Sequence, residues 1–279
     1  MSKSTMMVTG ATGGIGFHTA AALAATGAHV MLVGRSEARC QAAIAAIQHE
    51  HPDADVTYQV TDLSDQAQVV ALADDVQRRY ERLDVLINNA GAFFAQREES
   101  VDGIEMTWAL NHMAPFVLTT RLLPLLRASA PARIITVSSA AHQMGRMNFT
   151  DLEGRQRYSG WPAYAQSKLA NLLFTYELAD RLRDADVTVN ALHPGFVASG
   201  FGQNNHTFSM RAFAWLQQKF AISAEQGAQT SIYLAVSPQV AQVTGRYFVE
   251  SKAVPAAAHA YDVTARRQLW SLSEALVRA

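Results

Sequence analysis

The chain has 279 residues, of which 49% are hydrophobic and 17% are charged. This composition excludes a disordered or fibrous protein and predicts a globular chain with a large buried core. The 23 basic and 24 acidic residues give a formal net charge of −1, and there is no run of Lys and Arg, so we expect no nucleic-acid partner. Length alone favours about two domains.

The number of cysteines and the first residues of the chain indicate the cellular compartment of the protein. Cys40 is the only cysteine, so no internal disulfide can form, and no Cys/His spacing matches a zinc site. Residues 1–5 run directly into a predicted strand and leave no room for a signal peptide, and no apolar run is long enough to cross a bilayer. We therefore expect a cytoplasmic protein without a metal or a membrane anchor.

Apolar runs of strand length alternate with longer segments of helical periodicity along the chain. This alternation is typical of βαβ units around a buried parallel sheet. Because crossovers between parallel strands are right-handed, helices should cover both faces, which predicts an α/β fold with a doubly wound, Rossmann-type sheet. The expected strands are residues 5–9, 28–33, 55–61, 83–88, 132–138, 187–192 and 245–249.

The first strand ends in a glycine-rich turn that leads into a helical segment at residues 18–26. Glycines let the backbone approach a ligand closely, so a pyrophosphate can bind the N–H groups at the start of the helix. An ordinary tight turn is the alternative explanation. The residues expected to contact a dinucleotide here are Gly10, Thr12, Gly14, Ile15 and Gly16.

The end of the second strand indicates which dinucleotide binds. An acidic residue at this point usually binds the ribose 2′-hydroxyl of NAD, whereas an arginine accommodates the 2′-phosphate of NADP. Arg35 occupies the position, which favours NADP(H) over NAD(H), and a solvated arginine at a strand end is the alternative. Glu37, one turn into the next helix, should point away from the ribose.

Polar and small residues follow the third and fourth strands at the same sheet edge. We expect Asp62, with Leu63 beside it, to accept from the adenine amine. The segment Asn89-Ala90-Gly91 should let the backbone approach the adenosine ribose. Asp62 or Ser64 would also cap the following helix, and this structural role is compatible with a contact to adenine.

A tyrosine and a lysine one helical turn apart form the candidate catalytic pair. Tyr164 and Lys168 share one helix face at spacing i, i+4. A phenol with a pKa of about 10 is a poor acid or base near neutrality, and an adjacent ammonium stabilises the phenolate. The fifth strand ends in Ser138 and Ser139, which place a hydroxyl near the substrate. Asn111, in an apolar helical segment at 106–118, needs either a structural partner or a water beside Lys168.

These motifs resemble the short-chain dehydrogenase/reductase family, and the resemblance runs over nearly the whole chain. It implies one doubly wound domain spanning residues 1–279, with about seven strands in the order 3-2-1-4-5-6-7. It also implies hydride transfer between NAD(P) and a carbonyl or alcohol. The motifs that carry it are Thr9-Gly10…Gly14-x-Gly16, Asn88-Asn89-Ala90-Gly91, Asn111, Ser139, Tyr164…Lys168 and Pro194-Gly195.

The resemblance assigns roles to the catalytic candidates. Tyr164 is implied to be the general acid/base, and Lys168 to lower its pKa and bind the nicotinamide ribose. Ser139 is implied to orient the substrate oxygen, and Asn111 to hold the water of a proton relay. Pro194, Gly195 and Val197 are further expected cofactor contacts, although the threonine usual after the Pro-Gly pair is replaced here.

Within the family, the chain is similar to the retinol dehydrogenase and WW-domain oxidoreductase branch. The similarity rests on Ala140-Ala141-His142, on Asp151-Leu152 and on the terminal Leu269-Trp270. In that branch the second serine of the pair is the functional one, which favours Ser139 over Ser138. The N-terminal hydrophobic anchor common in animal retinol dehydrogenases is not seen, and a retinoid substrate is not implied.

Two long segments at residues 140–162 and 196–224 are expected to leave the sheet at the carboxyl ends of strands and to form the walls of a substrate pocket. Their aromatic content suggests an apolar or aromatic substrate. An amphipathic lid packing on its own core is an equally weighted alternative. The residues concerned are Met144, Met147, Phe149, Trp161, Phe196, Phe201, Phe208, Met210, Phe213, Trp215, Leu216 and Phe220.

The sequence therefore predicts an NADPH-dependent oxidoreductase that acts on a carbonyl or alcohol of an apolar or aromatic small molecule. The alternatives are a reductase of a conjugated C=C bond and a catalytically retired, NADP-binding regulatory protein. Relatives often dimerise through the helices that carry Asn111 and Tyr164, so a homodimer or homotetramer is a further expectation. The leucine-rich segment 122–126 permits such an interface, but it would also pack within a monomer.

Overall fold

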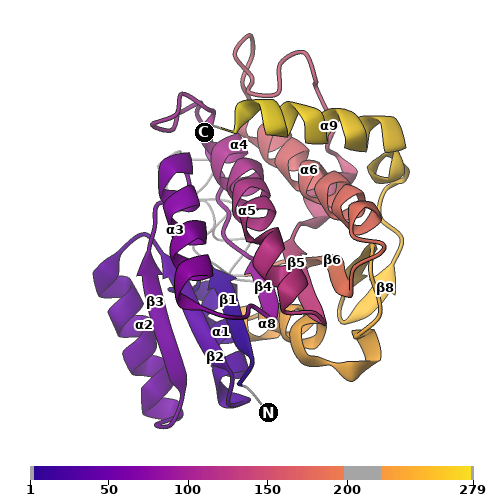
Figure 1. Cartoon of the computed structure of the whole chain (residues 1–279). Coiled ribbons are helices and arrows are strands. Elements are labelled where there is room, and N and C mark those ends of the chain that lie inside the picture. The colour runs from indigo at the N-terminus through magenta and orange to yellow at the C-terminus, as the bar shows by residue number, and fades with distance from the viewer. Residues whose placement is uncertain (1–2, 198–220, 278–279) are drawn as a thin grey trace.

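Eight strands form one sheet in the order β3-β2-β1-β4-β5-β6-β7-β8 (Figure 1). The computed structural model describes residues 3–197 and 221–277, and these strands lie within them. β1 to β7 run parallel, and β8 runs antiparallel to β7 at the edge. The strands are β1 (Thr5–Thr9), β2 (His29–Gly34), β3 (Asp55–Val60), β4 (Val85–Asn88), β5 (Ala132–Val137), β6 (Val187–His193), β7 (Arg246–Val249) and β8 (Lys252–Val254).

The predicted α/β fold with a doubly wound parallel sheet is confirmed, and so is the order of its first seven strands. Every residue of the central strands β1 and β4 is buried. A strand that is covered by helices on both faces has apolar residues at nearly every position, which explains the uninterrupted apolar runs in the sequence. The predicted strand ends differ from the observed ones by at most two residues.

The edge strand β8 is missing from the sequence prediction. It follows β7 after a turn formed by Glu250 and Ser251, whose φ angles are 49° and 60°. Tight hairpin turns with such angles usually contain Asn, Asp or Gly. Because neither turn residue is of these types, the sequence gives no hairpin signal here.

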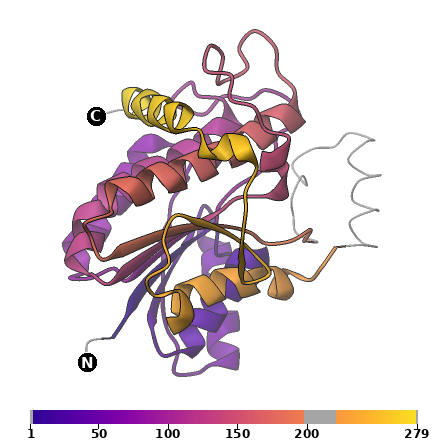
Figure 2. The ribbon, with the colours of Figure 1, turned by 90° about the vertical axis from the view of Figure 1, so that its right-hand side faces the viewer.

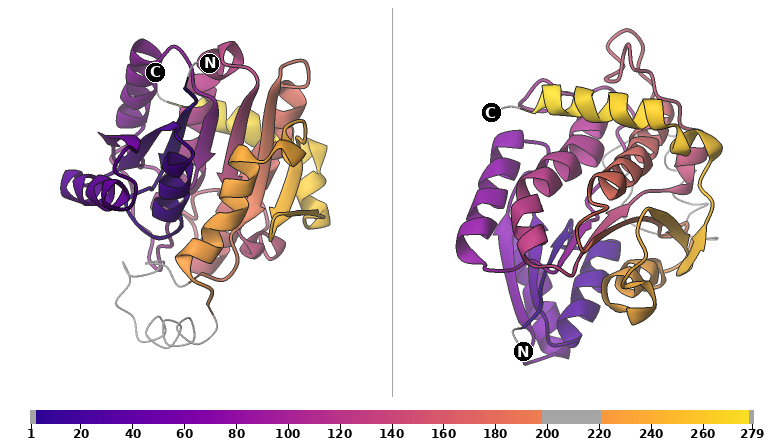
Figure 3. Two further views of the ribbon diagram at one scale, coloured as in Figure 1. Left: turned by 90° about the horizontal axis from the view of Figure 1, so that it is seen from below. Right: turned by 45° about the vertical axis from the view of Figure 1, so that its right-hand side comes forward.

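Helices cover both faces of the sheet, with α1, α2 and α8 on one face and α3, α5, α6 and α9 on the other (Figure 2, Figure 3). Within the described ranges, no helix has the length and apolarity needed to cross a bilayer. The helices and short turns are α1 (Gly14–Ala25), α2 (Glu37–Glu50), α3 (Gln66–Arg79), α4 (Met106–Trp108), η1 (Ala109–Met113), α5 (Ala114–Ala128), η2 (Ala140–Gln143), α6 (Gly160–Arg181), α8 (Ala224–Val236), η3 (Pro238–Val240), η4 (Ala258–Tyr261) and α9 (Val263–Leu276).

The predicted helical segment at residues 106–118 is helical throughout, and within it the π-helical turn η1 occupies Ala109–Met113. A π-helical turn inserts one residue into the helix and is frequent at functional sites. Here it lets two neighbouring side chains, Asn111 and His112, be fully buried in different surroundings.

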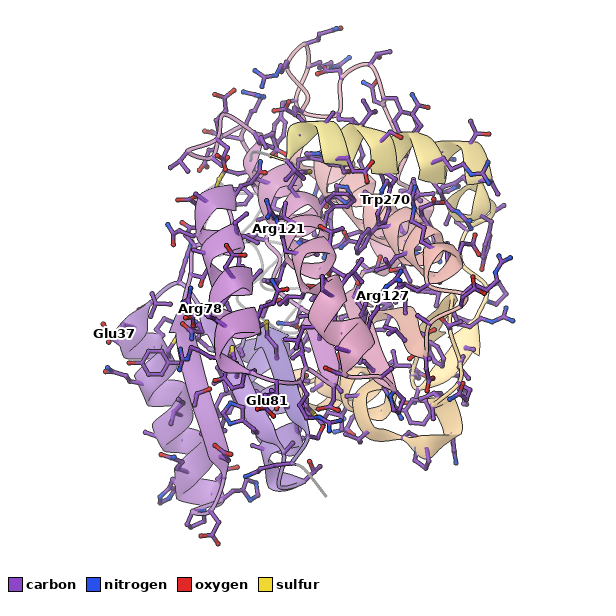
Figure 4. All side chains as sticks on the ribbon, viewed as in Figure 1. Glu37, Arg78, Glu81, Arg121, Arg127 and Trp270 are labelled. Atoms are coloured by element: carbon purple, nitrogen blue, oxygen red, sulfur yellow. The ribbon has the colours of Figure 1, made fainter. Side chains whose placement is uncertain are left out.

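The C-terminal helix α9 packs across α5 and α6, and Trp270 points from it toward them (Figure 4). The Trp270 ring stacks on Phe174 at a centroid distance of 5.9 Å and meets Phe116 edge-on at 5.1 Å. Deeper in the same interface, His112 Nε2 lies 2.8 Å from Ser273 Oγ. The helix that carries Tyr164 is thus covered by the chain's own C-terminal helix.

The leucine-rich segment 122–126 is mostly buried in this chain's own core. Leu122, Leu125 and Leu126 all belong to the main hydrophobic cluster. Of the two possibilities that the sequence left open for this segment, the structure shows packing within the monomer.

His112 makes the stability of the fold dependent on pH. Burial lowers the pKa of its imidazole to about 3, whereas an unfolded histidine has a pKa of about 6.5. The unfolded chain therefore binds more protons between these values, so the stability is complete above about pH 6.5 and falls as the pH drops. At pH 5.5 this one histidine should cost about 1.4 kcal/mol of unfolding free energy.

Urea unfolding at about pH 7.5 and about pH 5.5 measures this effect. In a double variant, His112→Phe with Ser273→Ala, both hydrogen-bonding partners are replaced by apolar groups, which is close to neutral for stability. The double variant should lose about 1.4 kcal/mol less than the wild type on acidification. An equal loss in both proteins would contradict the assignment to His112.

Candidate active site

A cavity of about 770 Å³ opens at the carboxyl ends of the parallel strands. This edge is where open α/β sheets bind ligands. Among the residues predicted to be catalytic or to bind the cofactor, only Asn111 does not line the cavity. Those that line it are Gly10, Thr12, Gly14, Ile15, Gly16, Arg35, Asp62, Leu63, Asn89, Ala90, Gly91, Ser139, Tyr164, Lys168, Pro194, Gly195 and Val197.

The glycine turn brings the start of α1 to the cavity without a side-chain cap on its first N–H groups. The helix begins at Gly14, earlier than the predicted residue 18. A Cβ on Gly16 would lie 2.3 Å from the carbonyl oxygen of Gly10, so only glycine fits there. Asn89 Nδ2 donates to the carbonyl oxygen of Thr9 at 2.8 Å and braces the turn. The uncapped N–H groups suit an anionic ligand such as a pyrophosphate.

Asp62 lies at the cavity but does not cap a helix. Its Oδ1 accepts from Ser64 N at 2.9 Å and from Ser64 Oγ at 2.7 Å. The N-cap of α3 is Asp65, which accepts from the backbone of Ala67 and Gln68. The prediction that Asp62 or Ser64 caps this helix is therefore wrong, because α3 begins only at Gln66.

Tyr164 and Lys168 lie on the first turns of α6, with Lys168 Nζ 5.6 Å from the centre of the Tyr164 ring. Lys168 Nζ donates to the carbonyl oxygen of Val137 at 3.0 Å, which fixes the ammonium at the end of β5. Burial lowers the pKa of Lys168 to about 8. Burial raises the pKa of Tyr164 to about 12, and a hydrogen bond with Ser139 opposes this rise. At neutral pH the phenol therefore carries its proton.

The two serines at the end of β5 have different partners. The side chain of Ser139 is hydrogen-bonded to Tyr164, and its Oγ accepts from Ala141 N at 3.2 Å. Ser138 Oγ instead donates to the carbonyl oxygen of Lys168 at 2.7 Å. The structure thus brings Ser139, the preferred candidate, to the phenol, and it turns Ser138 toward the backbone of α6.

The Asn111 side chain links two parts of the site. Its Oδ1 accepts from Ala92 N at 2.8 Å, and its Nδ2 donates to the Ala92 carbonyl oxygen at 2.9 Å. The same Nδ2 donates to Ser167 Oγ at 3.0 Å. Both amide hydrogens are engaged, so the side chain has one Oδ1 lone pair left with which to hold a water. Ala92 and Ser167 are therefore the partners that the buried Asn111 amide requires.

Comparison with known proteins agrees with this geometry. The family model described as short chain dehydrogenase matches residues 4–209. The chain belongs to the short-chain dehydrogenase family. It is therefore an NAD(P)-dependent oxidoreductase that acts on CH–OH or C=O groups.

Individual relatives and structures support the same family. This dehydrogenase is 40% identical to retinol dehydrogenase 14 of Mus musculus, over 99% of this chain and 86% of that protein. It is 41% identical to human retinol dehydrogenase 13, over 98% and 84% of the two chains. A crystal structure of a protein from Mycobacterium paratuberculosis superposes with a TM-score of 0.79 and 34% identity, over 99% and 94% of the two chains.

A further structural neighbour is a short chain dehydrogenase from Escherichia coli CFT073 complexed with NADPH. It superposes with a TM-score of 0.68 and 26% identity, and the match covers 90% of this dehydrogenase and 98% of the neighbour.

A second arginine, Arg39, lines the cavity of the dehydrogenase together with Arg35. Its Nη2 lies 3.3 Å from the position that a Cβ on Gly13 would take, so it reaches over the glycine turn. Sequence reasoning missed Arg39, although its place in the first turn of α2, directly after the strand end, is a usable signal. Glu37 accepts from Tyr58 and Gln41 at the outer edge of α2, away from the cavity, as expected (Figure 4).

Aromatic side chains form the wall beside Tyr164. Trp161 lies 5.0 Å from the Phe93 ring and 6.2 Å from the Tyr164 ring, measured between centroids. Met144 and Phe196 also line the dehydrogenase's cavity. The other predicted pocket residues Phe201, Phe208, Met210, Phe213, Trp215, Leu216 and Phe220 lie outside the described residues.

Two residues predicted for this wall lie elsewhere. Met147 and Phe149 pack against the main hydrophobic core and do not line the cavity. Residues 140–162 therefore contribute side chains both to the core and to the pocket of the dehydrogenase.

Gly91 lies where the lysine and the asparagine meet. A Cβ on Gly91 would lie 3.2 Å from both Lys168 Nζ and Asn111 Oδ1. Gly91→Ala should therefore push the ammonium away and lower kcat of the dehydrogenase about tenfold, since small displacements in an active site are costly. Steady-state kinetics and thermal unfolding measure the two effects separately. A variant with unchanged kcat would show that this contact adapts without cost.

Proposed function

We propose that this enzyme uses NADPH to reduce the carbonyl of an apolar aldehyde or ketone, reversibly, with Tyr164 as the general acid. One observation carries the proposal: the Ser139–Tyr164–Lys168 cluster and the glycine turn before α1 open into the same cavity. A dinucleotide held at the turn would therefore have its other end near the phenol.

The residues at the cavity fit a nicotinamide dinucleotide. The close approach of Gly16 to Gly10 and the uncapped start of α1 suit its pyrophosphate. Lys168 would hold the nicotinamide ribose, with Pro194, Gly195 and Val197 along the far wall. NADPH, when bound, supplies the hydride.

The cluster then supplies the proton and orients the substrate. Ser139 and Tyr164, which are hydrogen-bonded to each other, would both donate to the substrate oxygen. The phenol carries its proton near neutrality, which suits a general acid in the reducing direction. The Lys168 ammonium would stabilise the phenolate that remains after the proton is given up. Asn111 would hold the water that returns a proton to this pair.

The basic pair supports the preference for NADPH. Arg35 and Arg39 both line the cavity end that lies beyond β2, and Glu37 is turned away from it. A ribose 2′-phosphate is a dianion that two guanidinium groups can bind with charge-assisted hydrogen bonds. The structural neighbour complexed with NADPH adds support from the family.

The wall beside Tyr164 supports an apolar substrate. Its described members include Phe94, Met144, Trp161 and Phe196, and Gln143 is the polar side chain among them. Burial of a flat or elongated apolar molecule against these rings is favourable. The relatives named retinol dehydrogenases suggest an unsaturated, elongated alcohol or aldehyde as the first class to test.

A substrate panel tests the proposal. Purified enzyme is supplied with NADPH or NADH and with aromatic ketones, long-chain aldehydes and polyene aldehydes, and the products are identified by NMR. We expect an alcohol product and faster turnover with NADPH. Reduction of a C=C bond would replace the proposed reaction, and cofactor binding without turnover of any compound would indicate a retired, regulatory protein.

Three further expectations stay proposals. We propose that residues 1–279 form one domain, because the one sheet draws its strands from residues 5–254. A cytoplasmic location is supported by the buried free thiol of Cys40. A homodimer or homotetramer remains the expected assembly, to be measured by light scattering.

A further inference from the structure

We propose that His142 is a positioning residue for Ser139, and that it connects this serine to the C-terminal segment at Ala257. The inference rests on the proposed function, in which Ser139 and Tyr164 orient and protonate the substrate oxygen. His142 itself does not line the cavity, so it would act through Ser139.

The backbone around Ser139 needs an external support. Ser139 is the N-cap of η2, a single 3-10 turn at Ala140–Gln143. So short a turn has few internal hydrogen bonds with which to hold its shape. Its first carbonyl oxygen, that of Ser139, accepts twice from one residue: from His142 N at 3.1 Å and from His142 Nδ1 at 2.7 Å. The shorter of these bonds belongs to the imidazole.

The second ring nitrogen holds the imidazole in place. Ala257 N donates to His142 Nε2 at 3.2 Å, across 115 residues of sequence. A backbone N–H can only donate, so Nε2 must carry the lone pair and Nδ1 must carry the proton. That tautomer is the one that can donate to the Ser139 carbonyl. The two contacts therefore require each other.

The surroundings of His142 keep the ring buried and neutral. Its side chain is fully buried, and the Tyr247 ring on β7 meets it edge-on at 5.0 Å. His259 on η4 donates through Nε2 to the His142 carbonyl oxygen at 3.1 Å. Burial lowers the pKa of the imidazole, the hydrogen bond to the Ser139 carbonyl opposes this change, and His259 adds to the lowering. His193, at the end of β6, is a further nearby titratable group.

A protonated imidazole would have an N–H at Nε2 facing the N–H of Ala257. The contact that orients the ring would then become repulsive, and the Ser139 carbonyl would lose a fixed donor. Because the Ser139 side chain is bonded to the Tyr164 phenol, movement of this turn changes the two groups that hold the substrate oxygen. Arg146 Nη1, 3.5 Å from His259 Nδ1, is a fixed positive charge next to this network.

Two substitutions separate the two contacts of the ring. In His142→Asn the amide nitrogen occupies nearly the place of Nδ1 and keeps the bond to Ser139. In His142→Gln the longer side chain reaches the place of Nε2 and keeps the bond to Ala257 instead. We expect His142→Gln to lower kcat between about tenfold and about a hundredfold, with the KM for NADPH unchanged. We expect His142→Asn to retain most of kcat.

A pair of proline variants tests the other end without touching the histidine. Ala257→Pro removes the N–H that orients Nε2, and the φ of −60° at this residue suits proline. It should lower kcat about fivefold and move the acid limb of the pH–rate profile to higher pH, because Nε2 becomes easier to protonate. Ala258→Pro is the matched control at the first residue of η4, where proline is tolerated, and it should change neither value.

The outcomes distinguish a positioning role of His142 from a purely structural one. Equal kcat in His142→Gln, His142→Asn and the wild type would overturn the proposal, as would an unmoved acid limb in Ala257→Pro. If His142→Gln does not fold, the two proline variants decide, and nitrogen NMR of the imidazole reports the Nδ1–H tautomer directly. Tyr164→Phe is assayed in parallel. If this variant stays active, the proposed function is wrong. If it is inactive while His142→Gln keeps the wild-type kcat, only the proposed role of His142 is wrong.

Discussion

Tyr164→Phe is expected to lower kcat for carbonyl reduction about a thousandfold, the range typical for loss of a general acid. The substitution removes only the phenolic oxygen, so the ring contacts with Trp161 and Phe93 persist. Binding of NADPH should be unchanged, since Lys168 is held by the Val137 carbonyl oxygen and not by the phenol. Steady-state kinetics and a titration of NADPH binding measure the two quantities.

Tyr233→Phe is the matched control, because it removes a hydroxyl from α8 whose partner is Gln239, away from the cavity. This variant should keep the wild-type kcat. The pH profile adds a second check: the oxidation of the alcohol needs a deprotonated phenol, so its rate should rise with pH in the wild type. A Tyr164→Phe enzyme with wild-type turnover would exclude Tyr164 as the general acid.

Replacing Arg35 and Arg39 together by Asp is expected to weaken NADPH binding at least about a hundredfold, since hydrogen bonds between charged groups are among the stronger ones. NADH has no 2′-phosphate, so its affinity should change little. Each single variant should show a smaller loss than the pair. Titration of both cofactors against each variant gives the ratio of the affinities directly.

Arg121 and Arg127 provide the control for charge. Both are exposed on α5 and lie away from the cavity (Figure 4), and their replacement by Asp changes the net charge by the same amount. That double variant should keep the wild-type preference for NADPH. If the Arg35 and Arg39 variants also keep it, these side chains do not bind the 2′-phosphate.

The sequence predicted those parts of the fold and site that depend on short-range patterns. Buried parallel strands produce continuous apolar runs, and for this reason the first seven strands could be expected, whereas their order was implied by the family resemblance. The glycine turn and the Tyr164–Lys168 pair were equally visible, because each is defined within a few residues along the chain. The family resemblance followed from the same local motifs and is confirmed by the family match.

Other features depend on residues that are distant in sequence. Ser138 and Ser139 differ in their partners on α6: Ser138 Oγ donates to the backbone carbonyl of Lys168, whereas the Ser139 side chain is bonded to the Tyr164 phenol. Asn111 is bonded to Ala92 and Ser167, and only packing decides that its amide joins these two segments. The short strand β8 exists because β7 offers an edge with which to pair.

The same division applies to the C-terminal part of the chain. Neither the C-terminal helix α9 nor the face of the molecule that it covers was predicted from the sequence. The contacts of Ser273 with His112 and of Ala257 with His142 join segments that are more than a hundred residues apart. A hydrogen bond of this kind leaves no periodic trace in the sequence, because it depends on the relative placement of whole elements. The amino-acid sequence by itself therefore determined the family, the seven parallel strands and the proposed catalytic side chains, and the tertiary structure alone decided how those side chains are oriented.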